Sequence, residues 1–282
     1  MYGSTFRQIR EKCGVSLDKA AKGIVSPSTL SRWERGKGEI YFDNVLKLLK
    51  KLEINLNEFF GANYHSFNEE VAQRINAAYA DADSVKLKKI TIIQLKKYEK
   101  TQQLNTLFLA ASASNFYFEL TRECIFPINY QIKLRNILSD IENWDNFSIN
   151  LFNHSINFLP VGQTFNIAKR IINRIEEIQG CNSDNFYTAI SAILNALVKL
   201  IVRDAKCAEK LVDRIQGITV PATFLYLNVK RAFLIELLNY RMYRNYSIKR
   251  MNQIVLFLRK MNADNLAASL CRLFKQVKEL DN

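Results

Sequence analysis

Hydrophobic residues recur at helical spacing along the whole chain, and they predict short elements over the first 60 residues and longer ones afterwards. Ser4, Ser16 and Ser26 are the expected N-caps of the first three helices, because a serine hydroxyl can accept a hydrogen bond from a free N–H group of the first turn. Five short helices are predicted in this segment, over residues 4–14, 16–23, 26–36, 41–52 and 55–60.

The remainder of the chain has few glycines and prolines and predicts about ten helices joined by short connections. No alternating strand pattern appears, so the expected fold class is all-α. A weak self-similarity at about 35 to 45 residues per helix pair favours a TPR-like helical-repeat domain, an α-solenoid. The predicted helical segments are 71–79, 85–98, 104–120, 132–141, 147–159, 165–178, 186–202, 208–215, 224–243, 248–261 and 266–277.

Glycines place the domain boundary. Six of the nine glycines lie within the first 61 residues, and the texture of the sequence changes near the stretch GANYHS, residues 61–66. We therefore expect a first domain over residues 1–62 and a second over residues 67–282.

The stretch SPSTLSRWERG, residues 26–36, predicts a short helix with little to bury. Only Leu30 and Trp33 are large and apolar, and they lie three residues apart on one face. A tight turn at residues 23–26 joins it to the preceding helix, which is the arrangement of a helix-turn-helix, and it would be the recognition helix.

This interpretation assigns a role to the polar residues of the stretch. Arg32 can pair bidentately with guanine, and nearby hydroxyl groups can meet base edges or phosphates. The alternative is a small helical domain with solvated arginines, since residues 1–65 carry a net charge of only +4. The expected DNA-binding residues are Arg7, Arg10, Ser28, Thr29, Ser31, Arg32, Arg35 and Lys37.

The same residues resemble a known family. TFRQIREKCGVSL, SPSTLSRWERGKGEI and LLKKLEINLNEFF are similar to the Xre-type helix-turn-helix of the Rgg/GadR/MutR transcriptional regulators, and SRWERG followed by Glu39 and Ile40 is the most specific part. The likeness continues weakly through 144–159 and 230–277. It implies a DNA-binding domain joined to a helical-repeat domain, a homodimer, and regulation by short re-imported signalling peptides.

Most of the positive charge of the chain lies in the second domain. The chain carries +13 overall, and residues 66–282 hold +9 of it. A basic surface attracts anionic partners, so an acidic ligand is one explanation, and a general use of lysine in the proteome is another.

One predicted helix in the second domain presents a stripe of neutral amides. Asn150, Asn153, His154 and Asn157 fall at i, i+3, i+4 and i+7, and amides can bracket a peptide backbone because they both donate and accept. The chain has 27 asparagines, so solvated surface is the alternative. Ser191, Asn195 and Lys199 repeat the pattern. The full expected peptide-binding set is Asn150, Asn153, His154, Asn157, Ser191, Asn195, Asn228 and Arg231.

The sequence shows no motif for a metal site, a cofactor site or a catalytic centre. The five cysteines form no C-x-x-C pair and are expected to be buried free thiols in a reducing cytoplasm. We expect no metal, no cofactor, no membrane partner and no enzymatic activity, because neither a phosphate loop nor a nucleophile elbow appears.

The leading hypothesis is a cytoplasmic, homodimeric transcriptional regulator that binds operator DNA and a short signalling peptide, as in quorum sensing. The alternative keeps the DNA-binding domain but makes the repeat domain a protein–protein interaction scaffold with no peptide pheromone.

Overall fold

The structure is a computed structural model that describes residues 2–61, 67–181, 183–243 and 248–280. Its contacts divide the chain into two compact units, Met1–Asn76 and Ala77–Asn282. The predicted connection at residues 62–66 lies outside the described residues. Helix α6 (Phe67–Ala80) spans the point of division. Every regular element in the described ranges is helical, which agrees with the predicted all-α fold.

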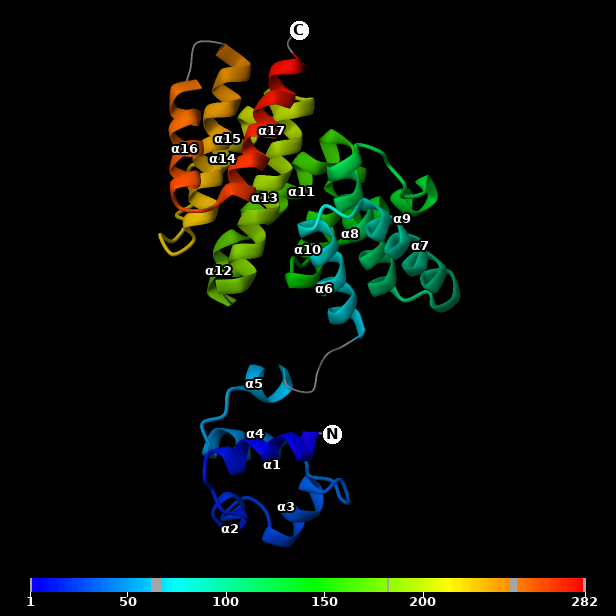
Figure 1. Cartoon of the computed structure of the whole chain (residues 1–282), viewed down its shortest axis with the longest axis vertical. Helices are drawn as coiled ribbons and strands as arrows, with labels where there is room; N and C mark the ends of the chain where they lie inside the picture. The colour runs from blue at the N-terminus through cyan, green and yellow to red at the C-terminus, as the bar shows by residue number, and fades with distance from the viewer. Residues whose placement is uncertain (1, 62–66, 182, 244–247, 281–282) are drawn as a thin grey trace. The chain divides into compact units, whose positions relative to one another are not determined.

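The first unit begins with five short helices, drawn in blue in Figure 1. They are α1 (Tyr2–Lys12), α2 (Leu17–Ala21), α3 (Pro27–Glu34), α4 (Phe42–Lys51) and α5 (Leu56–Gly61). Their apolar faces meet in one small core, whose buried members are Phe6, Ala20, Ala21, Leu30, Val45, Leu48, Leu49, Ile54 and Phe59. Burying a large apolar side chain contributes about 1.5–3 kcal/mol, so this core stabilises a unit whose helices are individually too short to persist.

Helices α1 and α3 approach each other closely at Gly3. A Cβ atom at Gly3 would lie 2.1 Å from the backbone oxygen of Trp33, so only glycine fits there. The structure corrects the predicted cap at Ser4, because α1 already starts at Tyr2 and Ser4 lies inside it.

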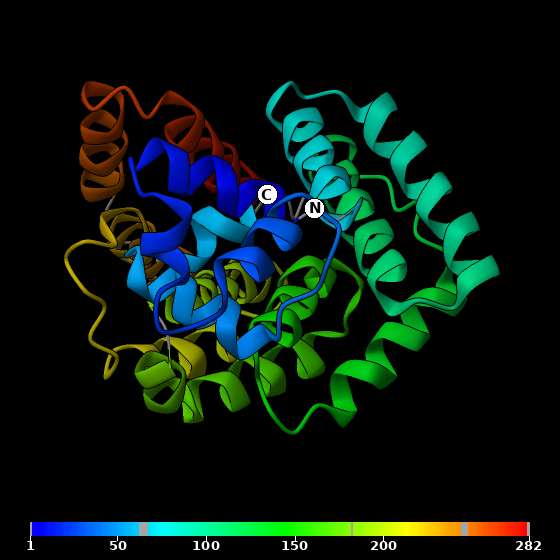
Figure 2. The same ribbon diagram turned by 90° about the horizontal axis from the view of Figure 1, so that it is seen from below.

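The second unit contains the long helices, which follow a curved path from teal through green to red when seen from below (Figure 2). After α6 come α7 (Ser84–Thr101), α8 (Leu104–Thr121), α9 (Ile128–Asp140), α10 (Asn146–Ser155), η1 (Ile156–Phe158), α11 (Val161–Asn173), α12 (Ile175–Cys181), α13 (Ser183–Arg203), α14 (Ala205–Ile215), α15 (Leu225–Tyr243), α16 (Ile248–Lys260) and α17 (Asp264–Glu279).

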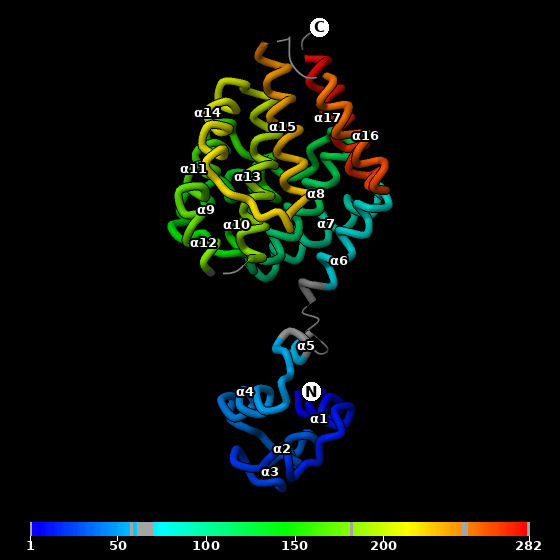
Figure 3. Tube along the Cα trace, turned by 90° about the vertical axis from the view of Figure 1, so that its left-hand side faces the viewer, coloured from blue at the N-terminus to red at the C-terminus, as the bar shows by residue number. Residues whose placement is uncertain are grey.

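These helices pack as two rows. Helices α8, α10, α13 and α15 each contact the next and form a central row, while α7, α9, α11, α14 and α16 pack beside them as flanking helices. Figure 3 shows α13 and α15 running side by side within this arrangement. Paired helices stacked in this way are the architecture of helical-repeat proteins.

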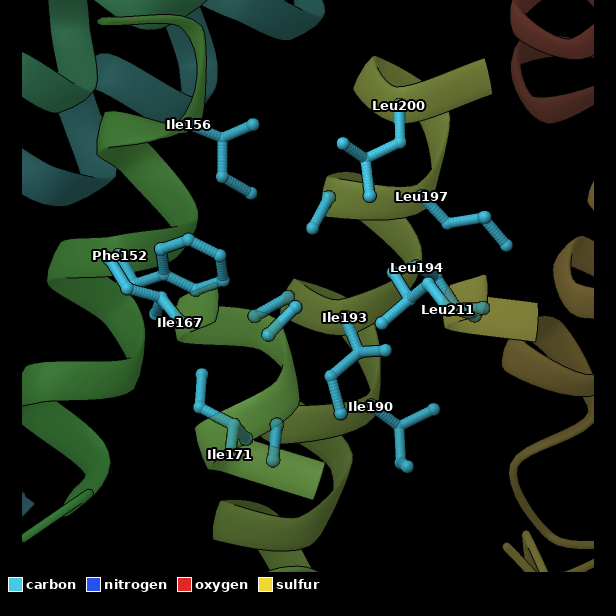
Figure 4. Packing of buried hydrophobic residues seen from close by; sticks show 14 of the residues in the cluster. Phe152, Ile156, Ile167, Ile171, Ile190, Ile193, Leu194, Leu197, Leu200 and Leu211 are labelled. Carbon is cyan, nitrogen blue, oxygen red and sulfur yellow. The ribbon is translucent and has the colours of Figure 1, made fainter. Parts of the chain in front are cut away.

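Helix α13 is the centre of the hydrophobic core. Its Ile190, Ile193, Leu194, Leu197 and Leu200 are buried among side chains of α10, α11 and α14 (Figure 4). Within the described residues, α13 is also the one helix long and apolar enough to cross a membrane, and 56% of that apolar window is buried inside the fold.

Two local features differ from the predicted helices. The segment 165–178 is split at Arg174, whose φ of −110° and ψ of 12° end α11 before α12 begins. The segment 147–159 ends in the 3₁₀ turn η1, where the Arg135 guanidinium donates two hydrogen bonds to the Phe158 carbonyl, at 2.9 and 2.8 Å. Side chains of other elements thus satisfy carbonyl groups that a longer helix would have paired internally.

The cysteines are less buried than the sequence predicts. Cys13 and Cys124 are exposed, and Cys207 and Cys271 are half-buried free thiols. The prediction of buried thiols is therefore wrong for these four, although the half-buried Cys207 packs against the hydrophobic core.

Candidate functional site

The turn between α2 and α3 has the geometry expected of a helix-turn-helix. The hydroxyl of Ser16 accepts a hydrogen bond from the N–H of Lys19, and the hydroxyl of Ser26 accepts one from the N–H of Thr29 at 3.1 Å. Gly23 has a φ of +81°, a left-handed conformation that glycine adopts without strain. Local sequence signals therefore fix both the start of α3 and its approach from α2.

Helix α3 is anchored on one side and open on the other. Leu30 is fully buried, and the half-buried Trp33 packs against Phe6 with ring centroids 5.6 Å apart. Ser28 and Arg32 are exposed, one turn apart on the same face. Thr29 and Ser31 are half-buried. The exposed face of α3 therefore offers a hydroxyl and a guanidinium to a ligand, as predicted for a recognition helix.

Arg10 is not at the surface where the sequence predicts it. It is 6% exposed and forms a paired contact with Glu34, Nε to Oε1 at 2.8 Å and Nη2 to Oε2 at 2.9 Å. Its Nη1 also donates to the Val15 carbonyl at 2.8 Å. All three groups of the guanidinium are engaged, so Arg10 locks α1 to α3 and is not available to a phosphate.

The other predicted phosphate contacts are exposed. Arg7 forms a surface ion pair with Glu11 at 2.8 Å, and this pair lowers the pKa of the Glu11 carboxyl. Arg35 donates to the Ser31 carbonyl at 3.1 Å, which holds its side chain along α3. Lys37 lies just beyond the end of α3 and is exposed. These three positive charges flank the open face of the recognition helix.

A second site runs along the central row of the repeat unit. Polar side chains from α8, α10, η1, α13 and α15 form hydrogen bonds across helix boundaries in three groups: Ser112 with His154, Asn115 with Asn157, and Asn195 with both Asn153 and Lys230. We call this set the polar network; its members are Ser112, Asn115, Glu119, Asn153, His154, Asn157, Asn195 and Lys230.

Two asparagine pairs in the polar network have the same spacing along the chain. Asn157 donates to the Asn115 side-chain oxygen at 2.8 Å, and Asn195 donates to the Asn153 side-chain oxygen at 2.8 Å. Each of these pairs is separated by 42 residues. Two successive boundaries of the central row, α8 with the α10–η1 segment and α10 with α13, are therefore each bridged by a pair of asparagines, and we call these two pairs the ladder of amides.

Both ends of the polar network are charged. At one end, Glu119 accepts hydrogen bonds from the Tyr79 hydroxyl at 2.7 Å and from Asn115 at 3.3 Å. At the other end, the Lys230 ammonium donates to the Asn195 side-chain oxygen at 2.5 Å. Loss of hydration raises the pKa of Glu119 and lowers the pKa of Lys230 to about 8.

His154 lies in the middle of the network as a neutral group. Its Nδ1 is 3.2 Å from the Ser112 hydroxyl, and its ring packs edge-on against Phe108 and Phe116. Burial lowers its pKa to about 4, so the imidazole is uncharged near pH 7. It can donate or accept a hydrogen bond but does not switch charge in the physiological range.

Aromatic side chains border the polar network. Phe116 stacks on Tyr79 with ring centroids 4.3 Å apart, which ties the last turn of α6 to α8. On the side of α15, Tyr187 meets Phe224 edge-on at 5.2 Å, and the Lys230 ammonium lies 5.9 Å from the Tyr226 ring. The network thus combines hydrogen-bonding groups with apolar surface, which is typical of small-ligand and peptide sites.

The structure brings together only part of the predicted peptide-binding set. Asn153, His154, Asn157 and Asn195 belong to the polar network, and Ser191 is half-buried one turn before Asn195. Asn150 instead bonds to Asn146 within its own helix.

Asn228 and Arg231 do not join the polar network. Asn228 donates to the Pro221 carbonyl at 3.0 Å, and Arg231 donates to the Ile218 carbonyl at 2.9 Å. Both hold the connection between α14 and α15. Asn228 also borders a separate groove of about 600 Å³ between α15 and α16.

Sequence reasoning missed Ser112, Asn115, Glu119 and Lys230. The signal for the first three is a polar stripe at i, i+3 and i+7 in an otherwise apolar helix, because such a stripe needs partners when the helix is buried. Lys230 carries no such signal, since it lies among other charged residues on α15.

Two family models match the chain. A helix-turn-helix model covers residues 6–59, and a model described as "HTH-type transcriptional regulator Rgg, C-terminal domain" covers residues 87–271.

Solved structures share the fold over nearly the whole chain. The SHP pheromone receptor Rgg2 of Streptococcus dysgalactiae matches with a TM-score of 0.76 and 20% identity, over 98% of this chain and 99% of that chain. A protein of Listeria monocytogenes EGD-e matches with a TM-score of 0.78 and 14% identity, over 100% and 98%. The PrgX/cCF10 complex matches with a TM-score of 0.70 and 14% identity, over 99% and 92%.

Proposed function

Because the chain belongs to the Rgg family of HTH-type transcriptional regulators, we propose that it binds operator DNA through α3 and a short signalling peptide along the polar network. The proposal of peptide binding rests on the ladder of amides that crosses α8, α10, η1 and α13. An extended peptide offers one donor and one acceptor per residue, and side-chain amides match both. Similar folds support this choice, since the matched structures include a pheromone receptor and a PrgX/cCF10 complex.

The DNA-binding half rests on the open face of α3. Arg32 specifies a base, with Ser28, Thr29 and Ser31 at base edges or phosphates, while Arg7, Arg35 and Lys37 set affinity through phosphates. Arg10 is withdrawn from this set because Glu34 and Val15 hold it in the interior. It serves instead to fix the orientation of the recognition helix.

Two copies of the chain then act together in the cytoplasm. A homodimer presents two recognition helices to half-sites about one DNA turn, roughly 34–36 Å, apart. Peptide binding changes DNA occupancy only if the peptide binds one arrangement of the dimer more tightly than the other. Light scattering of the full chain, with and without DNA, measures the number of copies.

The DNA assignment is tested by comparing two substitutions on operator DNA. Arg32→Ala should lower affinity for the matched sequence by about 1–3 kcal/mol and relax preference at one base position. Lys37→Ala should weaken all sequences alike and reduce the salt dependence by about one phosphate contact. Equal losses for Arg32→Ala on matched and mismatched operators would contradict the assignment of Arg32 to a base.

The peptide assignment is tested by titrating the full chain with synthetic peptides encoded by small open reading frames beside its gene. Asn195→Ala should weaken binding because it removes one step of the amide ladder. Asn252→Ala is the matched control, since Asn252 is exposed on α16. Absence of saturable binding at micromolar peptide would favour the alternative function, a protein-interaction scaffold.

A further inference from the structure

Lys230 is a cation inside the polar network with hydrogen-bonding capacity to spare. Its ammonium has three N–H donors, and the structure records one hydrogen bond, to the Asn195 side-chain oxygen. The ammonium also lies over the Tyr226 ring, 5.9 Å from its centroid. Among the described residues, no carboxylate forms an ion pair with it. An ammonium removed from water is stabilised most by an anionic hydrogen-bonding partner.

The other charged groups nearby are already satisfied. Lys199 donates to the Ile156 carbonyl at 2.6 Å and to the Leu159 carbonyl, so it closes the end of η1. Glu119, the nearest negative charge that acts on Lys230, accepts bonds from Tyr79 and Asn115. Lys230 differs from Lys199, because within the described ranges it has one hydrogen bond, to Asn195, and no ion pair with a carboxylate.

The surroundings of Lys230 fit the end of an apolar peptide. The side-chain nitrogen of Asn195 donates to Asn153, which leaves the Asn195 oxygen facing the Lys230 ammonium. The amide pairs therefore extend from Asn195 on the side away from Lys230. Tyr226, whose ring centroid is 5.9 Å from the ammonium, is 40% exposed and offers aromatic surface next to the charge. An ammonium beside aromatic surface suits a carboxylate that is flanked by apolar side chains.

On the basis of the proposed peptide-binding function, we propose that Lys230 anchors a carboxylate of the ligand, with the asparagine ladder running along the adjoining peptide backbone. The carboxylate comes either from the peptide C-terminus or from an acidic side chain, and both present the same two oxygens to the ammonium. Lys230 is one of the positive charges that residues 66–282 carry in excess, and this proposal gives it a specific role.

The test uses the full chain and three pools of octapeptides randomised over Ile, Leu, Val and Gly. The first pool ends in a free carboxylate, the second ends in a carboxamide and carries one Asp, and the third ends in a carboxamide with no acidic residue. Equilibrium dialysis followed by mass spectrometry measures how much of each pool the protein retains. We expect at least one carboxylate-bearing pool to bind about tenfold or more tightly than the neutral pool.

Substitutions locate the effect at Lys230. Lys230→Met should remove the preference for carboxylate, Lys230→Arg should retain it, and Lys210→Met is the matched control because Lys210 is exposed on α14. If Lys230→Met loses helical circular dichroism, Lys230→Gln takes its place in the comparison with Lys230→Arg. The pool that shows the preference identifies which of the two sources supplies the carboxylate.

Three results overturn the inference, and each is distinguishable from the others. Equal retention of all three pools by the wild-type chain leaves peptide binding intact and refutes the carboxylate site. Retention of none of the pools refutes the carboxylate site together with peptide binding. A carboxylate preference that survives in Lys230→Met refutes the assignment to Lys230.

Discussion

Breaking the Arg10–Glu34 pair should destabilise the first unit far more than breaking the surface pair beside it. Arg10 is 6% exposed and Glu34 is 4% exposed, so Arg10→Met leaves a buried carboxylate without its counterion. Removal of one member of a buried pair typically costs about 3–5 kcal/mol. The same change at Arg7, whose ion pair with Glu11 is about half exposed, should cost only about 0.2–1 kcal/mol.

The expected loss is large relative to the stability of a small unit. A folded unit of this size has about 4–11 kcal/mol of stability, at roughly 0.05–0.15 kcal/mol per residue, so the substitution removes a large share of it. Replacing both partners together, as in Arg10→Met with Glu34→Leu, should recover most of the loss because no charge is left buried.

Trp33 provides a local signal for this experiment. The chain has two tryptophans, and Trp33 lies in the first unit while Trp144 lies in the second. In a Trp144→Phe background, urea unfolding followed by fluorescence reports the first unit alone. The reasoning is refuted if Arg10→Met shifts the free energy of unfolding no more than Arg7→Met does.

DNA binding by the double variant separates a structural role from a phosphate contact. If Arg10 only fixes α3, the variant with Arg10→Met and Glu34→Leu keeps the wild-type dependence of DNA affinity on salt. If Arg10 contacts a phosphate, the slope falls by about one contact even though stability is restored.

Three further predictions concern stability. Gly3→Ala should destabilise the first unit, because its Cβ would meet the Trp33 backbone oxygen. Gly162→Ala has open space around the new Cβ and should stabilise its helix by about 0.5–1 kcal/mol. Urea unfolding measures both effects. Ser26→Ala should cost about 1 kcal/mol through loss of the N-cap bond, with the same assay. Burial lowers the pKa of Lys230 from 10.5 to about 8, so between these pH values Lys230 holds more protons in the unfolded chain than in the folded one. The stability of the second unit should therefore rise as the pH increases from 8 to 10. Urea unfolding at the two pH values measures this rise, and Lys230→Met should reduce it.

The first unit can be predicted from sequence because its signals are local. Ser16, Ser26 and Gly23 each act within a few residues, so capping and turn chemistry identify the helix-turn-helix without any tertiary information. The position of Arg10 cannot be predicted in this way, since its partner Glu34 lies 24 residues away and depends on how α1 packs against α3.

The polar network shows the same limit in the second unit. Helical periodicity predicts the helices, and the asparagine stripe of α10 is visible in the sequence. The pairing of Asn115 with Asn157 and of Asn153 with Asn195 depends on neighbouring helices that packing alone brings together. Their common separation of 42 residues indicates that a search for polar residues recurring at the repeat length would have found both pairs.

The bond between Tyr79 and Glu119 would give the proposed peptide site mechanical leverage on α6. Tyr79 lies in the last turn of α6, a single helix of 14 residues that spans the division between the two units. At a rise of 1.5 Å per residue, this helix is about 21 Å long. A tilt of about 10° at the turn that carries Tyr79 would move its other end by roughly 4 Å. A change of a few tenths of an ångström in where Glu119 and Phe116 hold that tyrosine is therefore enlarged several-fold along α6.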